Sequence, residues 1–167
     1  MPELVDVVIE DARWQAMDLM VLAQTACGAT LAHLDMAPKV YEIALLACDD
    51  PRICALNSDF RDKPQATNIL SWPAFELAAE SEGSAPDPVP NPGATEPVFL
   101  GDMAISYDTC MAEARAQSKS AADHVTHLLV HGCLHLLGYD HVLEKDACLM
   151  EGLEVSILAN LNISDPY

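Results

Sequence analysis

Basic residues are scarce in this 167-residue sequence, which has 8 lysines and arginines against 26 aspartates and glutamates and a formal net charge of −18. An electrostatic field of that sign repels nucleic acids and anionic membranes, so a polybasic membrane anchor is excluded. Nucleic-acid chemistry would require a locally basic site or a partner that delivers the substrate.

Long apolar runs and paired cysteines are also missing. The best candidate for a membrane helix is interrupted by Asp18 and Gln24 and falls short of the ~18 unbroken apolar residues that such a helix needs. The first residues lack the basic and apolar regions of a signal peptide. None of the six cysteines forms a C-x-x-C pair, so we expect reduced and mostly buried thiols. These features predict a cytoplasmic protein without membrane contacts.

The length and composition fit one domain spanning residues 1–167, with 51% hydrophobic and 20% charged residues. Residues 74–97 depart from this composition, because they contain several prolines and acidic residues and no lysine or arginine. Such a segment cannot bury enough apolar surface to fold on its own. We therefore expect a mobile, acidic, proline-rich insertion there.

Hydrophobic patterning predicts strands and helices in alternation. Apolar and β-branched runs predict strands at 4–9, 40–48, 67–72 and 97–106, the second of them buried on both faces. Helices are expected at 11–34, 52–59, 107–117, 120–137 and 144–162, with Asp11 and Ser120 as N-caps. This order is typical of an α/β or α+β fold.

The most informative stretch is residues 131–141. His131 and His135 are four residues apart on a predicted helix, so their imidazoles lie on one face and can hold one metal ion. Gly138 is expected to end the helix in a left-handed conformation, which brings His141 back toward the same ion. Three neutral nitrogen ligands with one open position are typical of catalytic zinc sites, whereas structural zinc domains use four protein ligands.

The spacing H-x-x-x-H-x-x-G-x-x-H equals that of the metzincin peptidases, but one residue differs. Peptidases carry a glutamate general base after the first histidine, and Gly132 occupies that position here. His127 lies one turn before His131, and a straight helix cannot wrap three such histidines around one ion. We therefore expect His127 beside the metal site or in the core.

The sequence resembles the bacterial YbeY endoribonucleases over about residues 4–163, and four segments carry the resemblance. Asn57–Arg61 resembles the family's N-x-x-[FY]-R, Thr67–Pro73 its T-D-V-L-S-F-P and Leu100–Ser106 its L-G-D-I-[VA]-I-S. His127–His141 follows the longest motif of the family nearly residue by residue. The departures are Asn68 for aspartate, Trp72 for phenylalanine and a longer insertion at 74–97.

The resemblance implies an α+β, zincin-like fold, with a single mixed, roughly four-stranded sheet packed with about five helices. It also implies a zinc-dependent, single-strand-specific endoribonuclease that acts in ribosomal RNA 3′-end maturation and ribosome quality control. One Zn²⁺ would then bind per chain through His131, His135 and His141. The implied partners are single-stranded ribosomal RNA, the small ribosomal subunit and its assembly factors.

Arg61 is the candidate catalytic residue for phosphate binding, since its guanidinium fork matches two phosphate oxygens. An ion pair with Asp59 or Asp62 is the alternative. Asp140 and Asp102 are candidates for acid–base work or for orienting a ligand, while Glu151 and Glu154 are expected to face solvent. A basic patch near the metal is expected if the fold gathers Arg52, Arg61, Lys63, Arg115 and Lys119.

Three alternatives remain open from the sequence. One is a metallopeptidase-like hydrolase on the same scaffold, against which Gly132 argues. The second is a non-catalytic ribosome assembly factor that keeps zinc for stability. The third is a structural zinc domain.

Overall fold

A computed structural model describes residues 3–90 and 95–167 of the chain. Its four strands form one mixed sheet in the order β1-β2-β4-β3. The strands are β1 (Val5–Ile9), β2 (Tyr41–Cys48), β3 (Ile69–Pro73) and β4 (Val98–Ser106). The β1–β2 and β2–β4 pairs are parallel, and β3 is antiparallel to β4. The predicted mixed four-stranded sheet of an α+β fold is confirmed, with β3 at one edge.

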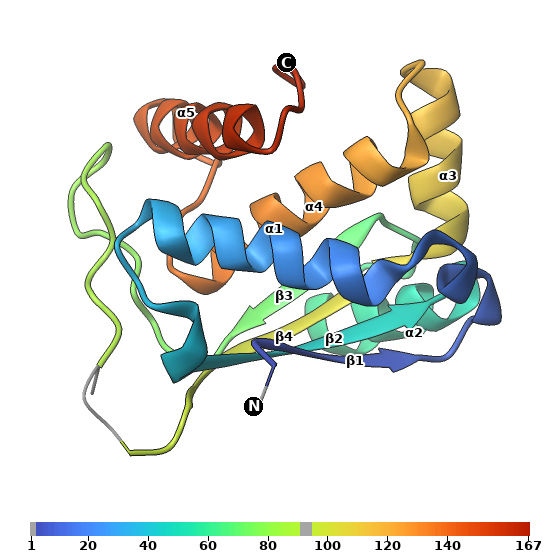
Figure 1. Ribbon diagram of the computed structural model, residues 1–167, viewed down its shortest axis with the longest axis horizontal. Helices are drawn as coiled ribbons and strands as arrows, with labels where there is room; N and C mark the ends of the chain where they lie inside the picture. The colour runs from blue at the N-terminus through green and yellow to red at the C-terminus, as the bar shows by residue number, and fades with distance from the viewer. Residues whose placement is uncertain (1–2, 91–94) are drawn as a thin grey trace.

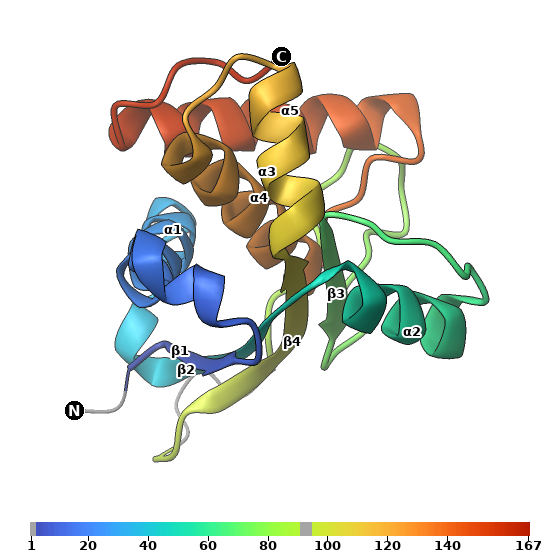
Figure 2. The same ribbon diagram turned by 90° about the vertical axis from the view of Figure 1, so that its right-hand side faces the viewer.

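Five α-helices surround this sheet, and two short 3₁₀ helices precede α1 and β2. The α-helices are α1 (Leu19–His33), α2 (Asp50–Arg61), α3 (Tyr107–Ala116), α4 (Ala121–Leu136) and α5 (Glu144–Asn160), and the 3₁₀ helices are η1 (Ala12–Met17) and η2 (Pro38–Val40). Figure 1 shows α1 and α4 lying across one face of the sheet, with α5 packed beyond them. Figure 2 shows α2 on the opposite side of the sheet.

The prediction of a single helix at 11–34 is wrong, because the helical segment is broken at Asp18. Asp11 caps η1 by accepting a hydrogen bond from the Arg13 backbone N–H, but η1 ends at Met17. Asp18 then adopts a left-handed conformation with φ 53°. A right-handed helix cannot continue through such a residue, and aspartate tolerates this conformation better than most side chains. Helix α1 therefore starts anew at Leu19 and continues through Gly28.

The main core lies between the sheet and the α1/α4 layer, and a smaller one lies under α2. The side chains of Ile43 and Leu45 on β2 enter the main core. On the other face of β2, Ala44 and Leu46 are only partly buried, because α2 packs mainly over β4 and the end of β2. The prediction that β2 is buried on both faces is therefore wrong.

The insertion at 74–97 is attached to the body of the protein in the part that the structure describes. Leu77 and Val89 are buried in the main core. The backbone N–H of Gly83 donates to Asp146 at 2.7 Å, and the N–H of Lys145 donates to Glu82. Figure 1 shows this loop running beside the start of α5. The expectation of a free surface insertion is therefore wrong at these points, and residues 91–94 lie outside the described residues.

The prediction that most cysteines are buried is confirmed. All six cysteines are described, and all are free. Four of them are buried, whereas Cys54 is partly buried and Cys148 on α5 is exposed. Among the described helices, none has both the length and the apolar character that crossing a membrane requires.

Candidate metal centre

Helix α4 carries two of the three histidines and packs unusually close to the sheet. Its N-cap is Ser120, whose side chain accepts a hydrogen bond from the Asp123 N–H, as predicted. A Cβ on Gly132 would lie 2.7 Å from Met103 Sδ and 2.9 Å from Ile69 Cδ1. Position 132 therefore carries no general base, and a side chain there would require Met103 and Ile69 to move.

Gly138 ends the helical segment and turns the chain toward the histidines. Its φ of +101° confirms the predicted left-handed conformation. A Cβ there would lie 2.9 Å from Leu77 and from Pro86, so the insertion also packs against this glycine. Because only glycine satisfies both demands, the turn that carries His141 is fixed by residue 138.

One ring nitrogen from each of His131, His135 and His141 lies within 4.8 Å of the other two. His131 Nε2 and His135 Nε2 are 3.0 Å apart. Two nitrogens bound to one tetrahedral zinc at ~2.0–2.1 Å would be ~3.3–3.4 Å apart. The three histidines therefore could hold one metal ion with small adjustments.

His135 is prepared to bind a cation as a neutral imidazole. Its Nδ1 lies 3.0 Å from the Tyr139 carbonyl oxygen, which can only accept, so Nδ1 carries the hydrogen and Nε2 the lone pair. Burial, together with the neighbouring His131 and His141, lowers the pKa of His135 to about 4. At neutral pH a metal ion does not compete with a proton at this ligand.

Glu154 on α5 was expected to face solvent, and this expectation is wrong. Its side chain is fully buried and lies against two histidines. Burial alone would raise the pKa of Glu154, but hydrogen bonds from His127, His131 and Tyr167 outweigh it and hold the pKa at about 2. The carboxylate is therefore ionised beside the histidine cluster. A sequence signal exists, because Glu154 falls in the buried stripe formed by Met150, Ile157 and Leu158.

A cavity of about 1210 Å³ opens beside the histidines. Arg61, Lys63 and Asn68 line it from α2 and the segment before β3, and Glu151 and Tyr167 line it from α5 and the segment after it. The two cations among these lining residues, Arg61 and Lys63, both come from the α2 side of the cavity.

Arg61 ends α2 and is tied to the sheet that supports α4. Its Nη2 donates to the carbonyl oxygen of Ser71 at 2.9 Å, and the Ser71 hydroxyl donates to the carbonyl of Gly132 at 3.2 Å. A guanidinium has five N–H donors, so this bond orients the side chain and leaves capacity for an anion. The structure thus favours a positioned Arg61 over an ion pair with Asp59 or Asp62.

The candidate acid–base residues separate in space. Asp140 lines the histidine cavity, and its Oδ1 accepts the His141 backbone N–H at 2.7 Å. His127 lies beside the cluster, as expected, and contacts Glu154. Asp102 instead lines an apolar groove on the α2 face, because successive side chains of β4 alternate and Met103 enters the main core. Asp102 therefore lies outside the histidine cavity.

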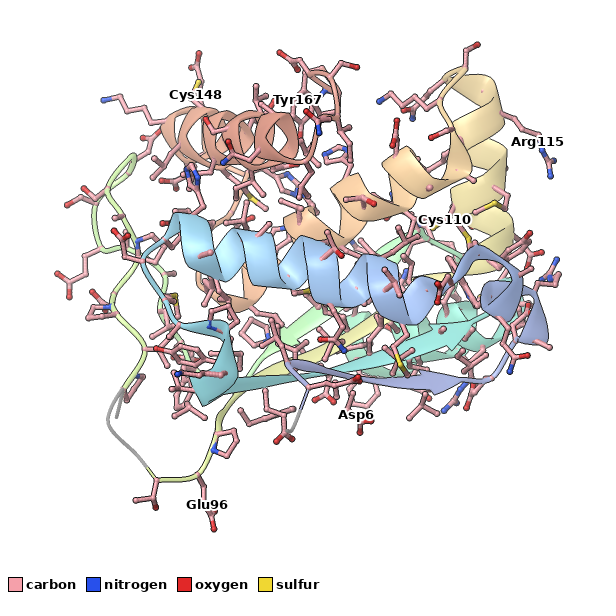
Figure 3. The ribbon with its side chains drawn as sticks, in the orientation of Figure 1. Asp6, Glu96, Cys110, Arg115, Cys148 and Tyr167 are labelled. Carbon is pink, nitrogen blue, oxygen red and sulfur yellow. The ribbon has the colours of Figure 1, made fainter. Side chains whose placement is uncertain are left out.

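The expected patch of five basic residues does not form. Arg61 and Lys63 line the cavity, but Arg52 pairs with Glu10 at 3.1 Å and Lys119 Nζ donates to the Pro166 carbonyl. Figure 3 shows Arg115 projecting outward from α3. The local positive charge beside the histidines is thus limited to two side chains.

Asn68 replaces the aspartate of the family motif and helps to hold the cavity wall together. Its amide Nδ2 donates to Glu113 at 3.1 Å, and its Oδ1 accepts the Ile69 backbone N–H at 2.6 Å. The amide therefore fixes the start of β3 next to the cavity.

Comparisons with known proteins cover nearly the whole chain. The family model described as Endoribonuclease YbeY matches residues 7–162. The chain is 57% identical to Endoribonuclease YbeY of Ruegeria pomeroyi over 162 residues, covering 97% of this chain and 96% of the relative. It is 55% identical to that of Cereibacter sphaeroides, with both chains covered completely. The solution structure of TM1509 from Thermotoga maritima shares the fold, with a TM-score of 0.55 at 13% identity over 95% of this chain and 91% of that one. From these matches and the histidine motif that they span, the chain belongs to the YbeY family of endoribonucleases.

Proposed function

We propose that this protein is a zinc-dependent, single-strand-specific endoribonuclease that works in ribosomal RNA 3′-end maturation and ribosome quality control. The observation that carries the proposal is the convergence of His131, His135 and His141 in a cavity that also holds Arg61. Family membership supports an RNA substrate. We further propose that the chain acts as a single domain and works in the cytoplasm.

His131, His135 and His141 would hold the zinc ion. When bound, zinc supplies Lewis-acid polarisation of a phosphate oxygen and of an attacking water. Arg61 would bind the scissile phosphate through its guanidinium fork and hold it toward the histidines. Asp140 would fix the backbone of His141 and so the direction of that ligand.

The cavity offers few cations that could attract RNA. Only Arg61 and Lys63 supply cations among the residues that line it, so few phosphates can be neutralised at one time. The net charge of −18 opposes long-range attraction of RNA. We therefore propose that the small ribosomal subunit and its assembly factors bring the RNA to the cavity, which raises its local concentration.

One experiment tests both the class of substrate and the proposed delivery of RNA by the small ribosomal subunit. The zinc-loaded protein is titrated, at near-physiological salt, with a single-stranded ribosomal RNA fragment, the same fragment annealed to its complement, and small-subunit particles. We expect slow cleavage of the free strand, protection in the duplex, and tighter binding and faster cleavage on particles.

Denatured casein serves as the control substrate and should stay intact, because Gly132 leaves no peptidase base. Casein hydrolysis would favour the metallopeptidase alternative, and the absence of any RNA cleavage would favour the non-catalytic assembly factor. Tight binding to the naked strand without gain from particles would contradict the delivery proposal.

A further inference from the structure

The buried carboxylate of Glu154 connects α5 to the histidine face of α4. Its Oε1 lies 2.6 Å from His127 Nε2 and 2.8 Å from the Tyr167 hydroxyl, which donates to it. Its Oε2 lies 3.3 Å from His131 Nδ1. One oxygen is thus anchored by two donors, and the other is directed at a proposed metal ligand.

The hydrogen positions follow from these partners. Glu154 Oε1 accepts from His127 Nε2, which places the ring hydrogen on Nε2, and among the described residues the buried His127 Nδ1 has no hydrogen-bond partner. Glu154 Oε2, which lies 3.3 Å from His131 Nδ1, is the acceptor of this pair, so His131 donates from Nδ1. His131 Nε2 then carries a lone pair, and this atom is the one that faces His135 Nε2 at 3.0 Å.

Resting on the proposed function, we propose that Glu154 is a positioning residue for the metal centre. Its carboxylate fixes the tautomer and ring orientation of His131 and balances part of the charge of a dication held by three neutral imidazoles. His127 and Tyr167 hold that carboxylate in place. A carboxylate that accepts from a metal-bound histidine also makes the histidine a stronger ligand.

Tyr167 extends this argument to the segment that follows α5. Figure 3 shows Tyr167 next to the end of α5, and its ring lies edge-on to His127 with centroids 5.6 Å apart. The residue is more than half exposed, so its replacement should disturb folding little. Tyr167→Phe therefore removes one anchor of Glu154 without opening the core.

The test compares zinc affinity, measured by competition with a chromophoric chelator, for three variants and the wild type. Glu154→Gln keeps the size of the side chain but loses the charge and should bind zinc about 10–100-fold more weakly. Tyr167→Phe should show a smaller loss of the same sign. The control is Glu144→Gln, which removes an exposed carboxylate from the first turn of α5, away from the histidine cavity, and should bind zinc as the wild type does.

Thermal unfolding of the metal-free variants separates positioning from plain structural support. A structural role alone would lower the melting temperature of Glu154→Gln and leave its zinc affinity equal to that of Glu144→Gln, and this result would overturn the proposal. Should Glu154→Gln fail to fold, unchanged zinc affinity in Tyr167→Phe would overturn it instead. A wild type that binds no zinc would defeat the proposed metal function itself, a distinguishable outcome.

Discussion

His135→Ala should lose nearly all of the one divalent metal ion that we expect per chain. The substitution removes one of three nitrogen ligands whose positions are fixed by a single helix and its terminal turn. The remaining two imidazoles cannot hold zinc against dialysis as three can. Elemental analysis of the dialysed protein measures this loss directly.

Two other histidines provide the controls for this variant. His33→Ala changes an exposed residue on α1 and should keep full metal content. His127→Ala should also keep one ion per chain, because its Nε2 contacts Glu154 and not the cluster. Stoichiometric metal in His135→Ala would contradict the ligand assignment, and a loss of metal in His127→Ala as complete as that expected for His135→Ala would mean that the third ligand is wrong.

Arg61→Lys should lower the kcat for RNA cleavage roughly 10- to 100-fold, with metal content and fold unchanged. Lysine keeps the charge but cannot donate two parallel hydrogen bonds to a phosphate. It also cannot keep the bond to Ser71 and bind the phosphate with the same geometry. Steady-state kinetics on a single-stranded RNA, together with elemental analysis, measures both quantities.

Arg115→Lys is the matched control, because the same change is made on α3, where the side chain projects away from the body of the protein. Its kinetics should equal those of the wild type. Equal kinetics for Arg61→Lys and the wild type would make Arg61 an ordinary surface cation.

The cluster of three histidines could be predicted from the sequence because its determinants are local. The four-residue spacing alone places His131 and His135 on one helix face, and Gly138 predicts the turn that brings His141 back toward them. Caps at Ser120 and Asp49 were equally local, since each side chain contacts a backbone N–H three residues further on. Such features depend on a few neighbouring residues, so they can be predicted without knowledge of the tertiary fold.

Features that depend on contacts between distant segments were not predicted. Glu154 approaches His131 only because α5 folds back over α4. Its position in the apolar stripe of α5 indicates burial, whereas its charge alone indicates exposure to solvent. The alternation along β4, with Met103 buried and Asp102 exposed, was a similar signal against Asp102.

The insertion failed as a prediction for a different reason. Leu77 and Val89 are isolated apolar residues in a polar, proline-rich segment, so they leave no periodic pattern. Their burial depends on the surface that Gly138 and the core present to them. Composition identifies such a segment as an insertion but does not reveal where it is attached.

The most direct measurement is a zinc titration of the chelated protein, with RNA cleavage and bound metal followed in the same samples. Cleavage of a single-stranded RNA should be absent after chelation and should return in proportion to bound zinc, reaching its maximum at one ion per chain. Undiminished cleavage by the metal-free protein, or zinc bound at one ion per chain with no return of cleavage, would contradict a metal-dependent endoribonuclease centred on His131, His135 and His141.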